Sequence, residues 1–321
     1  MDASVLDPAE FTETARRAAA ACAGLPLRAQ AVRLAEDGLL GILAAEDAGG
    51  LALGLPFAAA VVEAASGGLL AFPLIETILL ARALPVQEAA SLVAGGRVAT
   101  IAWAGGTATG VAGHAPFLRE AASVLVRSEG GGALVPVDPA ALDVVPGLDA
   151  DVPAAEMRLD TVPNGTVDWA ALESDALVLR TAAMLGAAEA AMGLAVEHTT
   201  PRKQFGRPLV AFQAVRHALA RQKLSVEGIR GSLIRALAEG NAADPYIRRT
   251  AFAFAADRAP AVAESALQLH GGMGFTWDIP VHRHLRHIRL WEAEGQAAPN
   301  RDAVARSLLD AARGYDWGDA A

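Results

Sequence analysis

Three segments in the C-terminal half carry residues whose types and spacing could do chemistry. The first covers residues 202–213 and places Arg202, Gln204 and Phe205 in one turn beside a glycine, with Gln213 a little further on. A guanidinium group can donate paired hydrogen bonds to a phosphate. The phenyl ring of Phe205 can stack against a flat ligand. A plain helix–helix corner with a solvated arginine is the alternative interpretation.

The second segment is rich in glycine and directly follows a helical pattern. Residues 266–275 contain Gln268 and then Gly271, Gly272 and Gly274. Glycine leaves room for another backbone or a ligand to approach closely. Successive bare amides can bind a phosphate. The simpler alternative is an ordinary glycine at the end of a helix.

The third segment, residues 280–296, combines arginines with carboxylates. Arg283 and Arg286 lie three residues apart and share a helix face, and Glu292 and Glu294 follow. The segment also holds histidines at positions 282, 284 and 287. Their spacing does not converge on a tetrahedral ligand set, so no metal site is expected. A basic surface helix that pairs with acids elsewhere is the alternative.

The elements that must position these segments are mainly helices. Residues 1–95 predict a small helical domain, with helices near 7–22, 27–37, 56–66 and 73–84. Residues 96–168 predict a small β domain, with short β-branched stretches at 98–103, 123–127 and 133–137. Residues 169–321 predict long helices near 172–200, 212–239, 244–270, from 280 and at 300–314. Their short connections favour an antiparallel bundle.

Composition narrows the class of protein. The formal net charge of −9 argues against a nucleic-acid partner. The one cysteine, Cys22, cannot form a disulfide framework within the chain, which fits a reducing compartment. Charged residues interrupt the apolar stretches, so no membrane span is expected. The sequence therefore predicts a soluble, cytoplasmic protein.

The order and spacing of the three segments resemble one known family. Arg-x-Gln-Phe-Gly at 202–206, Phe-Gln at 212–213, Gln-x-x-Gly-Gly-x-Gly-Phe at 268–275 and Pro-x-x-Arg-x-x-Arg at 280–286 are similar to the C-terminal domain of acyl-CoA dehydrogenases. Residues 41–54 resemble the family's glycine-rich N-terminal loop. The resemblance implies an N-terminal helical domain, a middle β domain and a C-terminal four-helix bundle.

The resemblance also implies FAD bound between subunits. Motif-matched positions assign Arg202, Gln204 and Phe205 to the flavin nucleotide and Gln213 to its adenine end. Gln268, Gly271 and Gly272 would meet the same FAD from the neighbouring subunit. The β region is short, and the flavin-facing Ser/Thr-rich motif of the family is absent from it.

The reaction that the resemblance implies is α,β-dehydrogenation of an acyl-CoA thioester. A carboxylate takes the α proton and FAD takes the hydride, and the electrons then pass to an electron-transfer flavoprotein or a similar acceptor. Glu294, in Glu-Gly-Gln, falls one position early for the family's base, so Glu292 is a rival. A second location used in the family falls close to Asp175.

The short length resembles subunits that pair with a related chain in a heterotetramer, often on bulky CoA esters such as steroid side chains. Three functions stay open. The chain is a catalytic subunit of a homo- or heterotetramer, a non-catalytic partner that completes the FAD and substrate sites of a related chain, or an acyl-CoA oxidase on the same fold.

Overall fold

A computed structural model describes residues 6–241 and 244–313. Its N-terminal part is helical, as expected. Asp7 caps the first helix by accepting a hydrogen bond from the Ala9 amide, and Pro8 occupies the first helical position. The helices are α1 (Pro8–Cys22), α2 (Leu27–Glu36), α3 (Leu55–Gly67), α4 (Leu74–Ala83) and α5 (Val86–Val93), with a 3-10 turn at Glu46–Ala48. Helix α5 was not predicted.

The β region contains two small sheets. One has the order β1–β4–β5, with β1 parallel to β4, and the other has the order β2–β3–β7–β6. The strands are β1 (Ala99–Ile101), β2 (Ala104–Gly106), β3 (Val111–Pro116), β4 (Ser123–Ser128), β5 (Gly131–Pro136), β6 (Leu142–Val144) and β7 (Ala154–Arg158). The sequence predicted β1, β4 and β5. It missed the second sheet, whose strands are short and rich in alanine and glycine.

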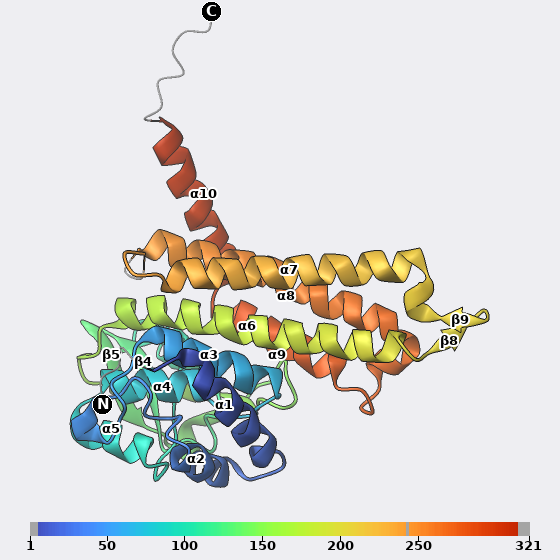
Figure 1. The fold of residues 1–321 in the computed structure, drawn as a ribbon. Helices are drawn as coiled ribbons and strands as arrows, with labels where there is room; N and C mark the ends of the chain where they lie inside the picture. Colours follow the sequence, from blue (N-terminus) through green and yellow to red (C-terminus); the bar gives the residue numbers. More distant parts are fainter. Residues whose placement is uncertain (1–5, 242–243, 314–321) are drawn as a thin grey trace, which may run out of the picture.

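The C-terminal part is a bundle of long helices, as predicted. It consists of α6 (Trp169–Thr199), α7 (Gln213–Leu237), α8 (Pro245–His270), α9 (Val281–Glu294) and α10 (Ala297–Arg313). A hairpin of β8 (Lys203–Gln204) and β9 (Arg207–Pro208) leads from α6 to α7, with 3-10 turns at Leu209–Ala211 and Gly271–Phe275. Helix α10 projects away from the bundle (Figure 1).

Helix α6 lies at the centre of the fold. It packs against α3 of the N-terminal part and against α7, α8 and α9 of the bundle (Figure 1). Among the described helices of at least 18 residues, it alone is long and apolar enough to cross a membrane, by length and composition. However, 72% of its apolar window is buried inside the protein. The apolar character of α6 is therefore explained by its place in the core.

Small residues let α3 and α6 approach closely. A Cβ added to Gly186 of α6 would lie 1.9 Å from the backbone oxygen of Glu63 in α3. We expect Gly186→Ala to destabilise the protein by about 1–3 kcal/mol, because the two backbones must separate. The free energy of unfolding in urea measures the change.

Gly193, on the same helix, provides a matched control. A Cβ there meets nothing within 4 Å. Because alanine favours helix over glycine by about 1 kcal/mol, Gly193→Ala should leave stability unchanged or raise it. Equal losses at both positions would contradict the close approach of α3 and α6.

Candidate active site

A buried contact between a carboxyl group and a guanidinium joins the end of α9 to the middle of α6. Glu294 is the last residue of α9, and its Oε2 lies 3.6 Å from Nη2 of Arg180. Both side chains are almost completely buried, with exposed fractions of 6% and 2%. Nε and Nη2 of Arg180 and Oε1 of Glu294 have no hydrogen-bond partner among the described residues. These atoms therefore retain capacity to bind a further group.

Two more residues complete the surroundings of Arg180. Its guanidinium carbon lies 4.2 Å from the ring centroid of Trp103, which follows β1. The indole Nε1 of Trp103 donates a 2.9 Å hydrogen bond to Oε1 of Glu76 on α4. Glu76 is itself only 5% exposed. The N-terminal domain, the β region and the bundle each contribute a side chain here.

Burial changes the proton affinity of these groups. Desolvation first and then the nearby carboxylate of Glu76 raise the pKa of Glu294, to about 8, although Arg180 opposes both effects. Desolvation also lowers the pKa of Arg180. Glu294 is therefore protonated for much of the neutral range, and its conjugate base is stronger than that of an ordinary carboxylate.

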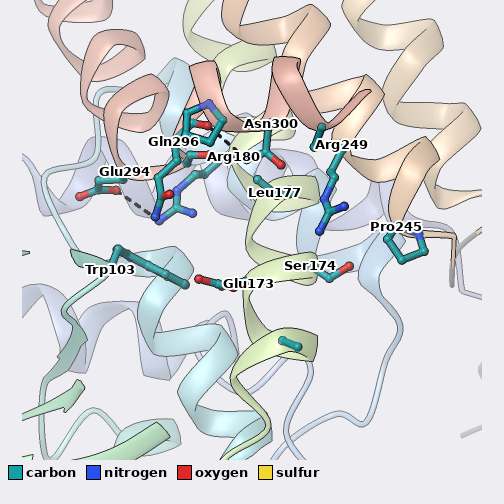
Figure 2. A pocket seen from close by; sticks show the side chains of 14 residues that line it. Trp103, Glu173, Ser174, Leu177, Arg180, Pro245, Arg249, Glu294, Gln296 and Asn300 are labelled. Carbon is teal, nitrogen blue, oxygen red and sulfur yellow. Dashed lines mark hydrogen bonds and ion pairs between the residues drawn. The ribbon is translucent and has the colours of Figure 1, made fainter. Parts of the chain in front are cut away.

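Glu294 faces a pocket of about 380 Å³. Figure 2 shows Arg180 reaching from α6 to Glu294, with Trp103 close to Arg180. The rim of the pocket is polar. Its residues include Ser174 of α6, Arg249 of α8, Gln296 between α9 and α10, and Asn300 of α10. The pocket thus combines an acid–base group at its base with cationic and amide groups near its mouth.

The structure separates Glu294 from the two rival carboxylates. Glu292 points elsewhere, accepts a 2.7 Å hydrogen bond from Arg289 and lines a different, more open hollow. Asp175 is buried but is held by Arg82 and by Arg248, the latter at 2.5 Å. Both oxygens of Asp175 are therefore already engaged by guanidinium groups. Of the three candidates, only Glu294 lines the pocket.

The corner after α6 presents the first set of predicted cofactor residues to solvent. Phe205 has a φ of 52° at the tip of the β8–β9 hairpin, and its side chain is 93% exposed. Arg202, Gln204 and Gln213 are also exposed. The ring of Phe205 meets the ring of Phe212 edge-on at 6.3 Å, but most of its surface stays open to solvent. It is placed to cover something outside the chain.

The glycine segment lies beside this corner. The ring of His270, at the end of α8, stacks at 4.6 Å on the ring of His198, near the end of α6. Gln268, Gly271 and Gly272 are exposed, and a Cβ on either glycine would meet nothing within 4 Å. One chain therefore presents both segments at the same end of the bundle.

This end of the bundle suits a dinucleotide. It offers guanidinium donors, bare backbone amides over open space, and three exposed aromatic side chains. These side chains are Phe205, Phe275 (77% exposed) and Trp277 (68% exposed). Arg180 and Thr199 are 19 residues apart on α6, about 28 Å at the rise of an α-helix. The dinucleotide end and the Glu294 pocket of one chain are therefore too far apart to form one compact site.

His287 joins a cluster whose composition could hold a metal ion. Its ligand atom and those of Asp149 and Asp151 all lie within 4.8 Å of one another. However, Arg283 binds Asp151 at 2.6 Å, and Arg286 lies 3.6 Å from Asp149. Arg283 and Arg286 therefore already supply positive charge to the carboxylates of Asp151 and Asp149. We interpret the cluster as an ion-pair network that connects α9 to the β region.

Comparisons with known proteins agree with this geometry. The sequence model "Acyl-CoA dehydrogenase, C-terminal domain" matches residues 177–309. A probable acyl-CoA dehydrogenase, FadE25 of Mycobacterium tuberculosis, is 36% identical over 129 residues, which are 39% of this chain and 33% of the relative. The short-chain specific acyl-CoA dehydrogenase of Megasphaera elsdenii is 33% identical over 144 residues, 44% and 37% of the two chains. The chain thus matches about a third of the length of these curated relatives.

Solved structures extend the likeness to the whole chain. The Tcur3481-Tcur3483 steroid ACAD superimposes with a TM-score of 0.85 at 25% identity, over 96% of this chain and 99% of the other. The ChsE4-ChsE5 complex of M. tuberculosis gives 0.83 at 25% identity, with the same coverage. The helical domain, β region and bundle define an acyl-CoA dehydrogenase fold. Residues 177–309 match the C-terminal domain of the acyl-CoA dehydrogenase family, and the chain as a whole has the fold of that family.

Proposed function

We propose that this chain is a subunit of an FAD-dependent acyl-CoA dehydrogenase and that Glu294 is its catalytic base. The observation that carries the proposal is the position of Glu294. It is a buried carboxyl group with a pKa raised to about 8, and it lines the pocket beside Arg180. A base that must take a proton from carbon works best when its pKa lies near the operating pH.

The residues of the pocket divide the remaining tasks. When bound, FAD supplies the hydride acceptor and passes electrons to an electron-transfer flavoprotein or a similar acceptor. Ionised Glu294 takes the α proton of the thioester. Arg249, exposed at the rim, is placed to meet a phosphate of coenzyme A. The walls formed by Trp103 and Leu177 keep water away from the reacting carbon.

An oligomer follows from the separation of the two half-sites. The dinucleotide end and the Glu294 pocket lie about 28 Å apart along α6, so each needs a complement from another chain. Helix α7 also exposes large apolar side chains, Leu224 at 73% and Ile234 at 63%. Such side chains are typical of an interface. Because two similar structures are described as a steroid ACAD and as a two-protein complex, we propose a related chain as partner and a bulky CoA ester as substrate.

A second function is favoured by one observation. Arg180 already pairs with Glu294 and stacks on Trp103, so these side chains fill part of their own pocket. A chain with a self-paired pocket could serve as the non-catalytic partner. It would then lend residues 202–213 and 268–275 to the FAD of a related chain.

The visible absorption spectrum separates these alternatives. We expect the chain alone to purify with little flavin and to gain stoichiometric flavin bands when co-expressed with a related chain. Turnover of an acyl-CoA with a dye acceptor should then appear, without matching oxygen consumption. Full flavin in the chain alone would show a homo-oligomer. Oxygen consumption matched to product would instead indicate an oxidase.

Removing one donor at the dinucleotide end should weaken FAD binding. We expect Arg202→Gln to lower FAD affinity by about 10- to 150-fold, because a hydrogen bond to a charged group contributes about 1.5–3 kcal/mol. Flavin fluorescence during titration of the apo-oligomer measures this. Arg306→Gln, an exposed arginine on α10, is the control and should bind FAD normally. Equal affinities for the two variants would remove Arg202 from the site.

A further inference from the structure

We propose that Glu76, Arg180 and Glu294 form one proton-binding unit, in which Arg180 contacts Glu294 directly and reaches Glu76 through Trp103, and in which Glu76 sets when Glu294 releases its proton. Glu76 is thus a positioning residue, supplied by the N-terminal domain through α4. The inference deepens the proposed function, on which its catalytic meaning rests. It assigns a role to a residue that carries no sequence motif.

The charges of the unit do not balance if both carboxyl groups are ionised. Arg180, Glu76 and the side chain of Glu294 are 2%, 5% and 6% exposed, so water cannot screen them. One cation then faces two anions in a medium that penalises net charge. Retaining one proton on a carboxyl group restores neutrality.

The hydrogen bonds decide which carboxyl group keeps the proton. Oε1 of Glu76 accepts a 2.9 Å hydrogen bond from the indole N–H of Trp103, so this oxygen already has a donor. Oε1 of Glu294 has no such donor among the described residues. The proton therefore resides on Glu294, in agreement with the raised pKa of this group.

The other groups around the unit are few and lie further towards the pocket mouth. Glu173 on α6 and Arg249 on α8 carry opposite charges and line the same pocket. Gln296 and Asn300 are neutral. Trp291 of α9 lies near Glu76 in a small hollow of about 40 Å³. None of these duplicates the close negative charge of Glu76.

The unit has a consequence for catalysis. When ionised Glu294 takes the α proton of the substrate, the unit returns to its neutral state. The negative charge of Glu76 thus favours proton uptake by Glu294 in the reacting complex. The same charge delays ionisation of Glu294, so turnover should rise with pH towards about 8.

Neutralising Glu76 tests the unit without requiring turnover. Glu76→Gln keeps an amide oxygen for Trp103 but removes the charge. We expect the titration midpoint of Glu294 to fall by about one pH unit or more. Infrared spectroscopy of the protonated carboxyl band follows this titration directly, and Glu294→Gln identifies the band by removing it. Glu292→Gln, on the same helix, should leave the midpoint in place.

Two further results make the test decisive. Glu76→Asp keeps the charge and should titrate close to the wild-type protein, which separates charge from packing and serves if Glu76→Gln does not fold. An unshifted midpoint in Glu76→Gln, with the band present, overturns the unit. If the assembled enzyme shows no turnover, the proposed function fails, but the infrared titration still decides whether Glu76 controls Glu294.

Discussion

Replacement of Glu294 by glutamine is expected to lower turnover of the assembled enzyme by about 100- to 10,000-fold, the range that a general base contributes. Glutamine has nearly the same shape but cannot accept the α proton. Because residues 202–213 and 268–275 lie at the other end of α6, the FAD content should not change. Single-turnover bleaching of the flavin by substrate measures the chemical step directly.

The neighbouring carboxylate provides the control for this loss. Glu292 pairs with Arg289 and does not line the Glu294 pocket, so Glu292→Gln should keep nearly full turnover. Unchanged turnover in Glu294→Gln would remove Glu294 as base. With flavin bands still present, that result would favour the non-catalytic partner.

The wild-type protein and Glu294→Gln should also differ in how their stability depends on pH. The folded-state pKa of Glu294 is about 8, above its usual value of 4.5. Between these values the folded protein holds a proton that the unfolded chain has lost, so this group lowers stability as pH rises from about 5 to 8. Tm measured across that window should fall less steeply for Glu294→Gln than for the wild-type protein.

Local signals explain why the helices could be predicted and the second sheet could not. Asp7 and Pro8 mark the start of α1, and Asp244 and Pro245 mark the start of α8, where the structure has both. Strands β2, β3, β6 and β7 lack β-branched alternation, and β3 changes register where it pairs with β7. Their pairing is set by contacts distant in sequence, which no local pattern records.

The residues of the candidate site also fall into two groups, those that a local motif indicates and those that only the fold brings together. Glu294 and the exposed cofactor segments stand in recognisable motifs, so the sequence alone is enough to propose them. Glu76, Trp103 and Arg180 come from three separate parts of the chain and meet only after folding. One signal was available, because an arginine inside the apolar run of α6 must find a buried partner. The sequence thus indicates that Arg180 needs a buried partner, but it does not show which residue that partner is.

Asp175 is expected to be among the most sensitive positions for stability. Its carboxylate forms ion pairs with Arg82 of α4 and Arg248 of α8, and its side chain is only 9% exposed. Asp175→Asn would leave two guanidinium groups facing each other without a countercharge. Breaking a buried pair in this way costs about 3–5 kcal/mol. Unfolding in urea, followed by far-UV circular dichroism, measures the loss.

An exposed ion pair supplies the comparison for Asp175. Asp143 and Arg158 pair at 2.8 Å on the β region with both side chains more than half exposed. Asp143→Asn should therefore cost less than about 1 kcal/mol. Because Asp175 connects the N-terminal helices to the bundle, its loss should also lower the slope of unfolding against urea by uncoupling these parts. Similar, small losses at both positions would show that Asp175 does not hold the two parts together.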